Sequence, residues 1–515
     1  MKTKTLIKVL SLALCLLMLV SALAACQKPA ENPEETTPAP SGNQGTVWET
    51  DENGYVKDMI PDDVDYGNAQ VKALIWKENK GQLFPDEETG ATKTIKTDIY
   101  NRNKEIEADL GVKFDPTFKE SNMGGGENQA ELYQAVLNGT DDWDIVCCYS
   151  LYPTQMMQEG LLYDLNSMEF PMTEMPWYSE DIQNWAIHDR LFYLANNSSI
   201  RNIQASWVVY VNNTMLKSKN VADIEETVIN MEWTLAKMKE ISRKWQSDAE
   251  ANSEDLKDAN NVYGLGISHR TAGQAFYHAA GFQTYTVDAT SGRHVQAYFE
   301  ASHIKLVSDF CDQLVDLVKS KEVAIGPYSS SEGDPQFGLK NHNAALFVSA
   351  LDQVGYIKER TDYSIIPLPM KDATQTRYYT IQNYAYDVWC IPTSSQDAKM
   401  CGIILEAISS DDYRNIAPKW WEDDFKYRYA NSDNGVKIFD LIRSSLVADF
   451  GRVTNGGSPY NALSAVLMPS KANTTPTNNY AVDVGSGKAT QQQALTNLYN
   501  TVERLLGIDA GAQQE

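Results

Sequence analysis

Residues 71–76 read VKALIW, a mostly apolar run that predicts a short buried strand. The residues after it alternate between helix and strand patterns. Apolar residues recur at helical spacing over Thr94–Leu110 and again over Glu127–Leu137. A second strand begins at Val112, and Asp144–Tyr149 (DIVCCY) forms a third. The order strand, helix, strand, helix, strand predicts a parallel sheet with helical crossovers.

The same alternation continues along the chain, so the predicted fold class is α/β. Further strands are predicted at Leu191–Leu194, Trp207–Val211, Tyr263–Ser268, Ala345–Val348, Tyr363–Leu368 and Asp387–Ile391. Further helices are predicted at Thr234–Trp245, His303–Lys319 and Ala398–Ile408. Gly124-Gly125-Gly126 precede the second helix and are predicted to form a loop.

Charge and hydropathy exclude two classes of protein. The chain has 515 residues, enough for two or three domains, and 43% of them are hydrophobic, as in globular proteins. The 44 Lys and Arg against 69 Asp and Glu give a net charge of −25. This charge repels phosphate backbones, so we predict no nucleic-acid partner. After residue 26 no run reaches the ~18 apolar residues of a membrane span, which excludes an integral membrane protein.

The first 26 residues have the pattern of an export signal. Three lysines in the first eight residues precede an apolar core, which ends at Leu23-Ala24-Ala25-Cys26. This ending resembles the lipobox of bacterial lipoproteins, which implies that residues 1–25 are a signal peptide and that Cys26 carries the lipid. An ordinary secretory signal or a short membrane helix is the alternative. Residues 27–66 are rich in Pro, Glu, Thr and Asn, so 26–66 is predicted to be a lipidated, disordered tether.

Catalytic motifs are absent from the sequence. No CxxC, HExxH, Walker-type GK[ST] loop or GxSxG elbow occurs, and the six histidines lack zinc-like spacing. Gly264-Leu265-Gly266 lacks the third glycine of a dinucleotide turn and is predicted to pack closely in a strand. Cys147 and Cys148 are predicted to be buried on opposite faces of a strand, with a vicinal redox pair as the alternative. We therefore predict no catalytic residue, metal or cofactor.

Eight segments, in this order and spacing, carry a resemblance to one family. They are VKALIW (71–76), DWDIV (142–146), QEGLLYDL (158–165), VVYVNN (208–213), the helix start at Trp233–Lys237, AAL (344–346), IPLP (366–369) and VWCIP (388–392). Together they resemble the carbohydrate-type extracellular solute-binding proteins of ABC importers, the clan that includes the maltose-binding proteins. The resemblance spans about Val71–Ser410. It fails over residues 166–200 and beyond about Tyr413, where the chain is longer and more aromatic than the simplest members.

The resemblance implies a periplasmic-binding-protein-like fold of type II, in which crossing hinge segments join two α/β lobes around a ligand cleft. The crossings are expected near Ser206–Asn212 and Tyr384–Ile391. Lobe 1 is then 67–205 plus about 387–440, and lobe 2 is 206–386 plus about 441–515. The resemblance further implies a monomer, lipid-anchored to the outer face of the cytoplasmic membrane. It would capture extracellular carbohydrate, an oligosaccharide in our interpretation, by hinge closure and deliver it to ABC permease subunits without catalysing a reaction.

Sugar rings need flat aromatic side chains to stack on and polar side chains to bind their hydroxyls, and this chain has 11 Trp and 27 Tyr. Open α/β sheets bind ligands beyond the carboxyl ends of their strands. We therefore predict ligand contacts after the strands and at the crossings. The predicted residues are Glu78, Asn79, Lys80, Tyr149, Ser150, Tyr152, Trp207, His269, Arg270, Ser349, Asp352, Tyr384, Tyr386 and Trp420.

Two other classes stay open at the level of the sequence. One is a glycan-active enzyme on a lipid anchor, for which acidic pairs such as Asp141-Asp142 would supply carboxylates. The other is a surface adhesin that transports nothing. Within the class of binding proteins, a peptide is the alternative ligand.

Overall fold

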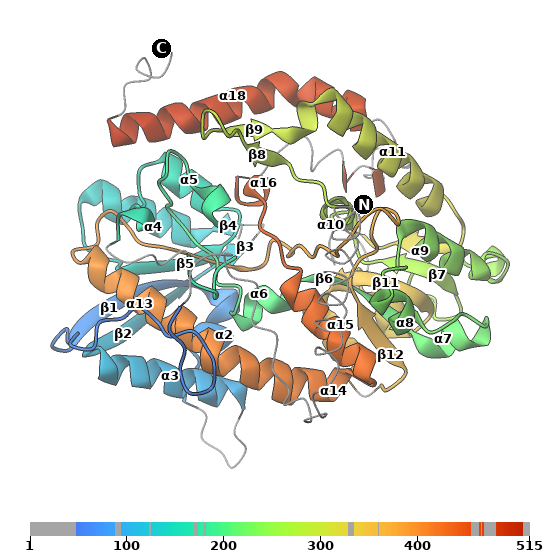
Figure 1. Cartoon of the computed structure of the whole chain (residues 1–515), viewed down its shortest axis with the longest axis horizontal. Helices are drawn as coiled ribbons and strands as arrows, with labels where there is room; N and C mark the ends of the chain where they lie inside the picture. The colour runs from blue at the N-terminus through green and yellow to red at the C-terminus, as the bar shows by residue number, and fades with distance from the viewer. Residues whose placement is uncertain are drawn as a thin grey trace, which may run out of the picture. The chain divides into compact units, whose positions relative to one another are not determined.

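The computed structural model describes residues 48–507, apart from 88–93, 123–124, 169–173, 180–181, 328–333, 359, 455–462, 465 and 468–479. Two β-sheets organise these residues (Figure 1). The first has the order β13-β5-β1-β2, with β1 (Ala69–Trp76), β2 (Val112–Lys119), β5 (Ile145–Tyr149) and β13 (Asp387–Cys390). The second has the order β10-β7-β11-β6-β12, with β6 (Trp207–Asn212), β7 (Tyr263–Ile267), β10 (Val323–Ile325), β11 (Ala344–Ala350) and β12 (Tyr363–Ile366).

In the first sheet, β1 runs parallel to both of its neighbours, with Val71 beside Phe114 and Ala73 beside Ile145. β13 comes from more than 200 residues further along the chain and joins β5 in the antiparallel direction. Every residue of β5 and β13 is buried. Continuous burial of this kind explains why these strands read as apolar runs rather than as alternating patterns.

In the second sheet, β7 is parallel to β10 and β11, whereas β6 is antiparallel to β11 and β12. The prediction of close packing at Gly264 and Gly266 is confirmed. A Cβ at Gly264 would lie 2.0 Å from the Ser242 carbonyl oxygen, and one at Gly266 would lie 2.4 Å from the Phe347 ring. Side chains larger than hydrogen do not fit at these two positions.

Helices connect and cover the strands. They are α2 (Lys80–Leu83), α3 (Ile95–Asp109), α4 (Glu127–Asn138), α5 (Pro153–Gln158), α6 (Ile200–Gln204), α7 (Asn213–Ser218), α8 (Ile224–Ile229), α9 (Leu235–Ser242), α10 (Ala272–Ala279), α11 (Ala301–Val318), α12 (Phe337–Asn341), α13 (Ala398–Asp411), α14 (Tyr427–Tyr429), α15 (Asp433–Ser444), α16 (Phe450–Val453) and α18 (Tyr480–Leu506). α9 begins where predicted, because the Thr234 side chain accepts a hydrogen bond from the Lys237 amide. Among the described residues, no helix has the length and apolar character to cross a bilayer.

Two local predictions differ from the structure. Leu191–Leu194 is not a full strand, since only Leu194 forms a bridge, to Trp389. Gly125–Gly126 is β4, which pairs with β3 (Ser121–Asn122) instead of forming an open loop. A Cβ on Gly126 would lie 2.7 Å from the Tyr152 ring, so the glycine allows that ring to pack against the backbone.

The chain passes between the two sheets in paired segments. Before β6 the passage covers roughly 195–206, and before β13 it covers roughly 380–386. These segments bond to each other, since the Trp207 amide donates to the Ile381 carbonyl (3.0 Å) and the Asn383 amide donates to the Ala205 carbonyl (2.7 Å). The predicted crossings, Ser206–Asn212 and Tyr384–Ile391, mostly cover the strands β6 and β13. The observed passages between the sheets lie just before these two strands.

The segment 48–66, assigned to the tether in the prediction, contacts the body of the chain. Tyr55 packs edge-on against Tyr413 at 5.6 Å between ring centroids. Asp58 forms an ion pair with Arg414 (2.5 Å). Thr50 bridges to Val56. Residues 26–47 of the predicted tether lie outside the described residues.

Glu406 on α13 is fully buried, and Trp177 Nε1 donates a hydrogen bond to its Oε2 (3.1 Å). Burial, with a smaller contribution from the Asp58 charge, raises the pKa of Glu406 to about 8. An unfolded glutamate ionises near pH ~4.3. The folded chain therefore holds a proton there that the unfolded chain releases. Its contribution to stability is fully present below about pH 4.3 and is lost as the pH rises toward the raised pKa.

The wild-type chain should lose unfolding free energy as the pH rises from about 5 to about 8. We expect this loss to be smaller by about 1–3 kcal/mol in Glu406→Gln, because glutamine does not titrate. Urea unfolding at both pH values measures this difference. The control is Glu240→Gln, which changes a carboxyl with 59% exposure on α9. Equal pH dependence in wild type and Glu406→Gln would contradict the prediction.

Candidate ligand-binding site

The strand ends that carry the predicted residues meet around the crossing segments. In the first sheet the carboxyl end of β5 lies beside the start of β13, with Tyr149 opposite Asp387. In the second sheet the carboxyl end of β11 lies beside the start of β6, with Ala350 opposite Trp207. The Leu351 amide donates to the Ser206 carbonyl (2.8 Å), which ties this edge of the second sheet to the first crossing. The loops after β1, β5, β7 and β11 therefore lie on the edges that the carboxyl-end rule predicts.

A buried carboxylate, Asp387, organises the edge of the first sheet. Its side chain accepts hydrogen bonds from Trp76 Nε1 (2.7 Å), Asn79 Nδ2 (2.5 Å) and Ser199 Oγ (2.9 Å). Its backbone amide donates to Asn202 Oδ1 (2.6 Å). Burial raises the pKa of Asp387, and the hydrogen bonds to its carboxylate oppose that rise. Asp387 thus holds the end of β1 and the start of α6 in one arrangement.

Helix α6, whose start is held by Asp387, carries Arg201, a residue that the sequence analysis missed. The Arg201 guanidinium lies 5.6 Å from the centroid of the Trp76 ring. Its Nη1 is 3.4 Å from Asp352 Oδ2, in the segment after β11, and the two side chains are 19% and 25% exposed. Its Nε is buried and has no hydrogen-bond partner among the described residues. Arg201 therefore links strand-end residues of both sheets and leaves one buried donor unsatisfied.

Six predicted residues keep exposed or half-buried side chains beside these strand ends. They are Glu78, Lys80, Tyr152, His269, Arg270 and Asp352. His269 packs edge-on against Trp207 at 5.2 Å. Burial, followed by the Arg270 charge, lowers the pKa of His269 to about 4. The imidazole is therefore neutral at pH ~7 and can both donate and accept hydrogen bonds.

The other predicted residues around the crossings are buried and already bonded inside the protein. They are Asn79, Tyr149, Ser150, Trp207, Ser349, Tyr384 and Tyr386. Ser150 Oγ donates to the Tyr384 carbonyl (2.7 Å), and Ser349 Oγ donates to Gln336 Oε1 (3.1 Å). The guanidinium of Arg452 lies 3.7 Å from the centroid of the Tyr384 ring. In this arrangement these side chains support the crossings.

Trp420 belongs to a different part of the fold. It lies in the π-helical segment Lys419–Lys426 between α13 and α14 and packs against Trp421 and Phe425. It is 5% exposed. Trp420 therefore lies in an aromatic cluster of the C-terminal third. The structure does not bring it to the strand ends that carry the other predicted residues.

The two adjacent cysteines of β5 are buried and free. Burial raises the pKa of both thiols, Cys147 and Cys148, well above the ordinary value. A redox pair needs an accessible thiolate, so this environment supports the prediction of small buried hydrophobes.

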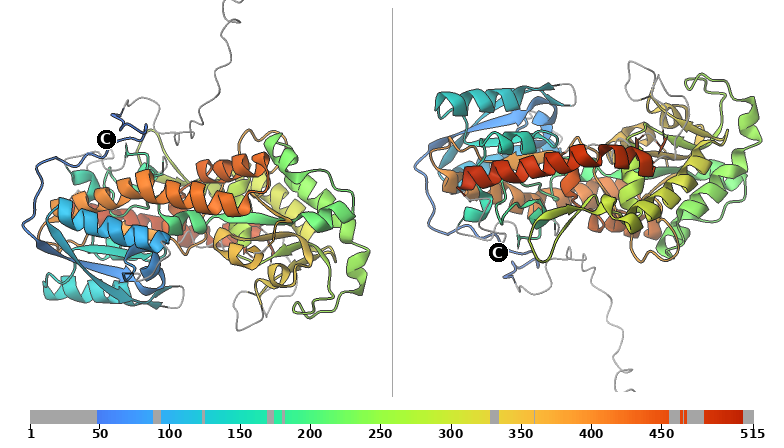
Figure 2. Two further views of the ribbon diagram at one scale, coloured as in Figure 1. Left: turned by 90° about the horizontal axis from the view of Figure 1, so that it is seen from below. Right: turned by 90° about the horizontal axis from the view of Figure 1, so that it is seen from above.

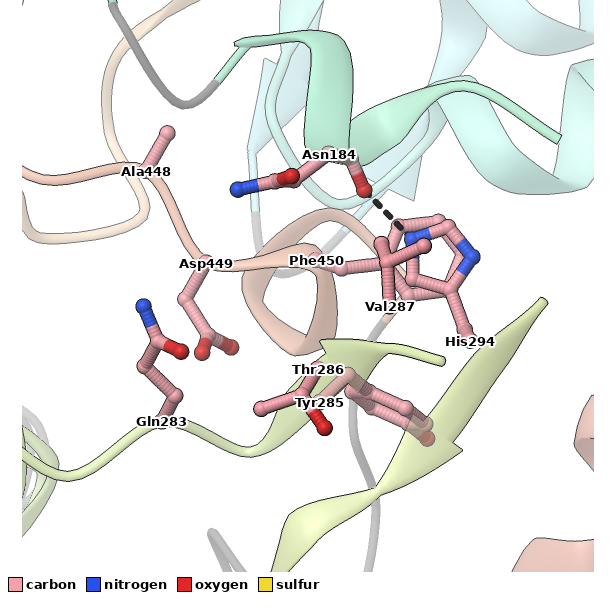
Figure 3. A pocket seen from close by; sticks show the side chains of 9 residues that line it. All are labelled: Asn184, Gln283, Tyr285, Thr286, Val287, His294, Ala448, Asp449 and Phe450. Atoms are coloured by element: carbon pink, nitrogen blue, oxygen red, sulfur yellow. Dashed lines mark hydrogen bonds between the residues drawn. The ribbon is translucent and has the colours of Figure 1, made fainter. Parts of the chain in front are cut away.

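A cavity of about 90 Å³ lies elsewhere (Figure 3), and none of the predicted residues lines it. Its walls are Asn184, the β8–β9 hairpin with the residues before it, and the chain before and at the start of α16. β8 spans Tyr285–Val287 and β9 spans His294–Gln296. The lining residues are Asn184, Gln283, Tyr285, Thr286, Val287, His294, Ala448, Asp449 and Phe450. Asp449 accepts hydrogen bonds from the amides of Thr284 and Gly451, both at 2.9 Å.

No protein-family model and no curated protein matches the sequence. The structure is similar to solved structures of binding proteins. One is the galacto-N-biose/lacto-N-biose I-binding protein of an ABC transporter from Bifidobacterium longum, in complex with lacto-N-biose, with 12% identity and a TM-score of 0.56 over 84% of this chain and 98% of that chain. Another is a sugar transporter from Rhizobium etli in an open conformation, with 14% identity and a TM-score of 0.51 over 84% and 99%.

The two separate sheets, the paired crossings and this similarity agree with one another. The chain therefore has the periplasmic-binding-protein fold of two α/β lobes joined by paired crossings.

Proposed function

We propose that this chain is the substrate-binding lipoprotein of an ABC import system, which captures an extracellular carbohydrate and delivers it to a membrane permease. One observation carries the proposal: Arg201 stands between Trp76 of the first sheet and Asp352 of the second, where strand-end loops of both lobes meet. A guanidinium beside a carboxylate suits the hydroxyl groups of a sugar ring, and the Trp76 ring, which is only 2% exposed, supports the guanidinium from within the core.

In this proposal the ligand bridges the two lobes, and hinge closure about the paired crossings encloses it. Arg201 and Asp352 bind hydroxyl groups as donor and acceptor, and neutral His269 can serve in either role. Tyr152 offers a half-buried ring beside Tyr149 at the end of β5. The lobe boundaries proposed for this motion are those expected from the sequence, 67–205 with about 387–440, and 206–386 with about 441–515.

The anchor and the partners rest on the sequence pattern. Cys26 and the signal peptide lie outside the described residues, so lipidation of Cys26 stays a prediction. So do the attachment to the outer face of the cytoplasmic membrane, the permease partner and the monomeric state. The similarity to binding proteins supports a role without catalysis, against the adhesin and the glycan-active enzyme.

A thermal-shift screen against mono- and oligosaccharides tests the proposed function. A ligand that binds only the folded chain stabilises it by about 2.7 kcal/mol at a concentration of 100 Kd, which raises Tm by several degrees. We expect such a rise with at least one oligosaccharide, and product analysis should recover that saccharide unchanged. A rise only with peptides would contradict the choice of ligand, and conversion of the saccharide would favour the enzyme.

A further inference from the structure

The C-terminal helix α18 connects the two lobes on a route separate from the crossings. It has 27 residues, which at 1.5 Å per residue is about 40 Å. It contacts α11, which packs near β10 of the second sheet, and α5, which follows β5 of the first. Both views show it running beside the β8–β9 hairpin (Figures 1 and 2).

The first end of α18 is held in the second lobe by apolar burial. Tyr480 and Val484 have no exposed surface. Tyr480 faces Tyr277 of α10 and Cys311 of α11. Side chains buried in this way are costly to expose, so this end of the helix is firmly attached.

The other end has apolar contacts too, since Val502 has no exposed surface and Leu505 lies against Gly160 of the first lobe, and it makes a polar contact, which we call the Glu503 junction. It comprises Glu503 of α18, His188 of the first lobe and Arg293 beside β9. Glu503 Oε1 lies 2.8 Å from His188 Nε2 and accepts a hydrogen bond from Arg293 Nη1 (2.9 Å). The Glu503 carboxylate is only 6% exposed, so water screens the contact little. A single carboxylate thus joins the helix, the hairpin and the first lobe.

A second contact supports the junction from the hairpin. His294 Nε2 lies 2.5 Å from the Asn184 carbonyl of the first lobe, and His294 Nδ1 lies 2.8 Å from Tyr499 Oη of α18. The Arg293 guanidinium covers the Tyr499 ring at 4.2 Å. The hairpin and α18 therefore reach the first lobe as one unit.

Two features indicate that this unit can separate from the first lobe. The cavity of about 90 Å³ lies directly beside the contact between Asn184 and His294, whereas permanent cores are close-packed (Figure 3). In addition, His188 and Asp189 have φ values of 51° and 58°, in the left-handed region that costs a residue other than glycine energy. Two backbone hydrogen bonds between Ile187 and Arg190 close this turn, and Glu503 contacts it through the His188 side chain.

We propose that the Glu503 junction is a latch between the lobes, which holds them in one relative placement and opens when they hinge. The inference rests on the proposed function, since a latch matters only in a chain whose lobes move. When the latch opens, its polar contacts are exchanged for water and the half-exposed side chain of Leu505 leaves Gly160, while Tyr480 and Val484 keep the helix attached to the second lobe. The hinge motion would then release one end of α18 and leave the other end fixed.

Distances between spin labels in the ligand-free protein test the latch. Leu137→Cys on α4 and Leu306→Cys on α11 place labels at positions with 65% and 55% exposure, one on each lobe. The five described native cysteines are buried and should stay unlabelled. We expect one narrow distance distribution in the doubly labelled parent. Glu503→Gln should widen that distribution by at least about twofold, because a neutral amide no longer pairs with His188 and Arg293.

His188→Asn is the second variant, because asparagine tolerates the left-handed conformation but is too short to reach Glu503. It should widen the distribution in the same way with little loss of Tm. The matched control is Glu240→Gln, which breaks the Lys237–Glu240 pair (2.7 Å) on α9. This variant should leave the distribution of label distances unchanged. A parent-like distribution in both junction variants would overturn the latch. Because no carbohydrate is present, a chain that fails the saccharide screen still gives this result.

Discussion

We expect Arg201→Ala to lower the affinity for the proposed carbohydrate ligand by about 10- to 100-fold. A hydrogen bond to a charged group contributes about 1.5–3 kcal/mol, and 1.4 kcal/mol corresponds to a factor of ten in Kd. Stability should change little, since the Arg201–Asp352 pair is partly exposed and its contact is 3.4 Å long. Titration calorimetry with the saccharide found in the screen measures the affinity, and thermal unfolding measures the stability.

The matched control is Arg360→Ala in the second lobe. Arg360 pairs with Asp362 at 2.6 Å, and these side chains are 35% and 27% exposed. Asp362 precedes β12, whose first residue pairs with Asn212 at the far end of β6 from Trp207. The control therefore removes a guanidinium from the opposite edge of the same sheet. If Arg201→Ala binds the ligand as tightly as wild type does, or if Arg201→Ala and Arg360→Ala lose equal affinity, Arg201 does not contact the ligand.

Asp387→Ala lowers the free energy of unfolding by about 3 kcal/mol or more. Trp76 Nε1, Asn79 Nδ2 and Ser199 Oγ lose their shared acceptor, and each buried donor without a partner costs about 1–3 kcal/mol. Removal of a desolvated carboxylate offsets part of this cost. Asp387→Asn should lose less, because its amide keeps one oxygen acceptor. Urea unfolding with a common slope measures the differences.

Asp397→Ala is the control for a lost carboxylate with a local role. Asp397 caps α13 by accepting a hydrogen bond from the Met400 amide (2.9 Å), and loss of such a cap costs about 1 kcal/mol. An Asp387→Ala variant no less stable than Asp397→Ala would show that the Asp387 network does not hold the edge of the first sheet together.

Most of the α/β pattern could be predicted, because it is written in local periodicity. VKALIW is the core of β1, and DIVCCY contains β5. The apolar stripe at Val307, Phe310 and Leu314 lies buried on α11. Each of these signals depends on neighbours within one or two turns of the chain, so no knowledge of the tertiary structure was needed to find them.

The candidate site could be predicted only in part. The carboxyl-end rule selected strand ends that lie beside the crossing segments, but it does not say how deeply each side chain is buried, so it selected exposed Glu78 together with buried Asn79. No local sequence pattern marks Arg201 as a site residue, because the residue that holds its helix α6 in place, Asp387, lies 186 residues further along the chain. Trp420 was chosen for its residue type, whereas aromatic packing with Trp421 and Phe425 decides its place.

The sequence by itself determined the α/β class, the alternation of strands and helices, and the acidic charge, from which we predict no nucleic-acid partner. It also determined that no catalytic motif is present. Only the tertiary structure decided that two sheets share paired crossings, that Arg201 stands between Trp76 and Asp352, and that α18 reaches from one lobe to the other. The reason is physical: hydrophobic periodicity is a property of adjacent residues, whereas hydrogen bonds and ion pairs join residues hundreds of positions apart, and only the packed core brings those together.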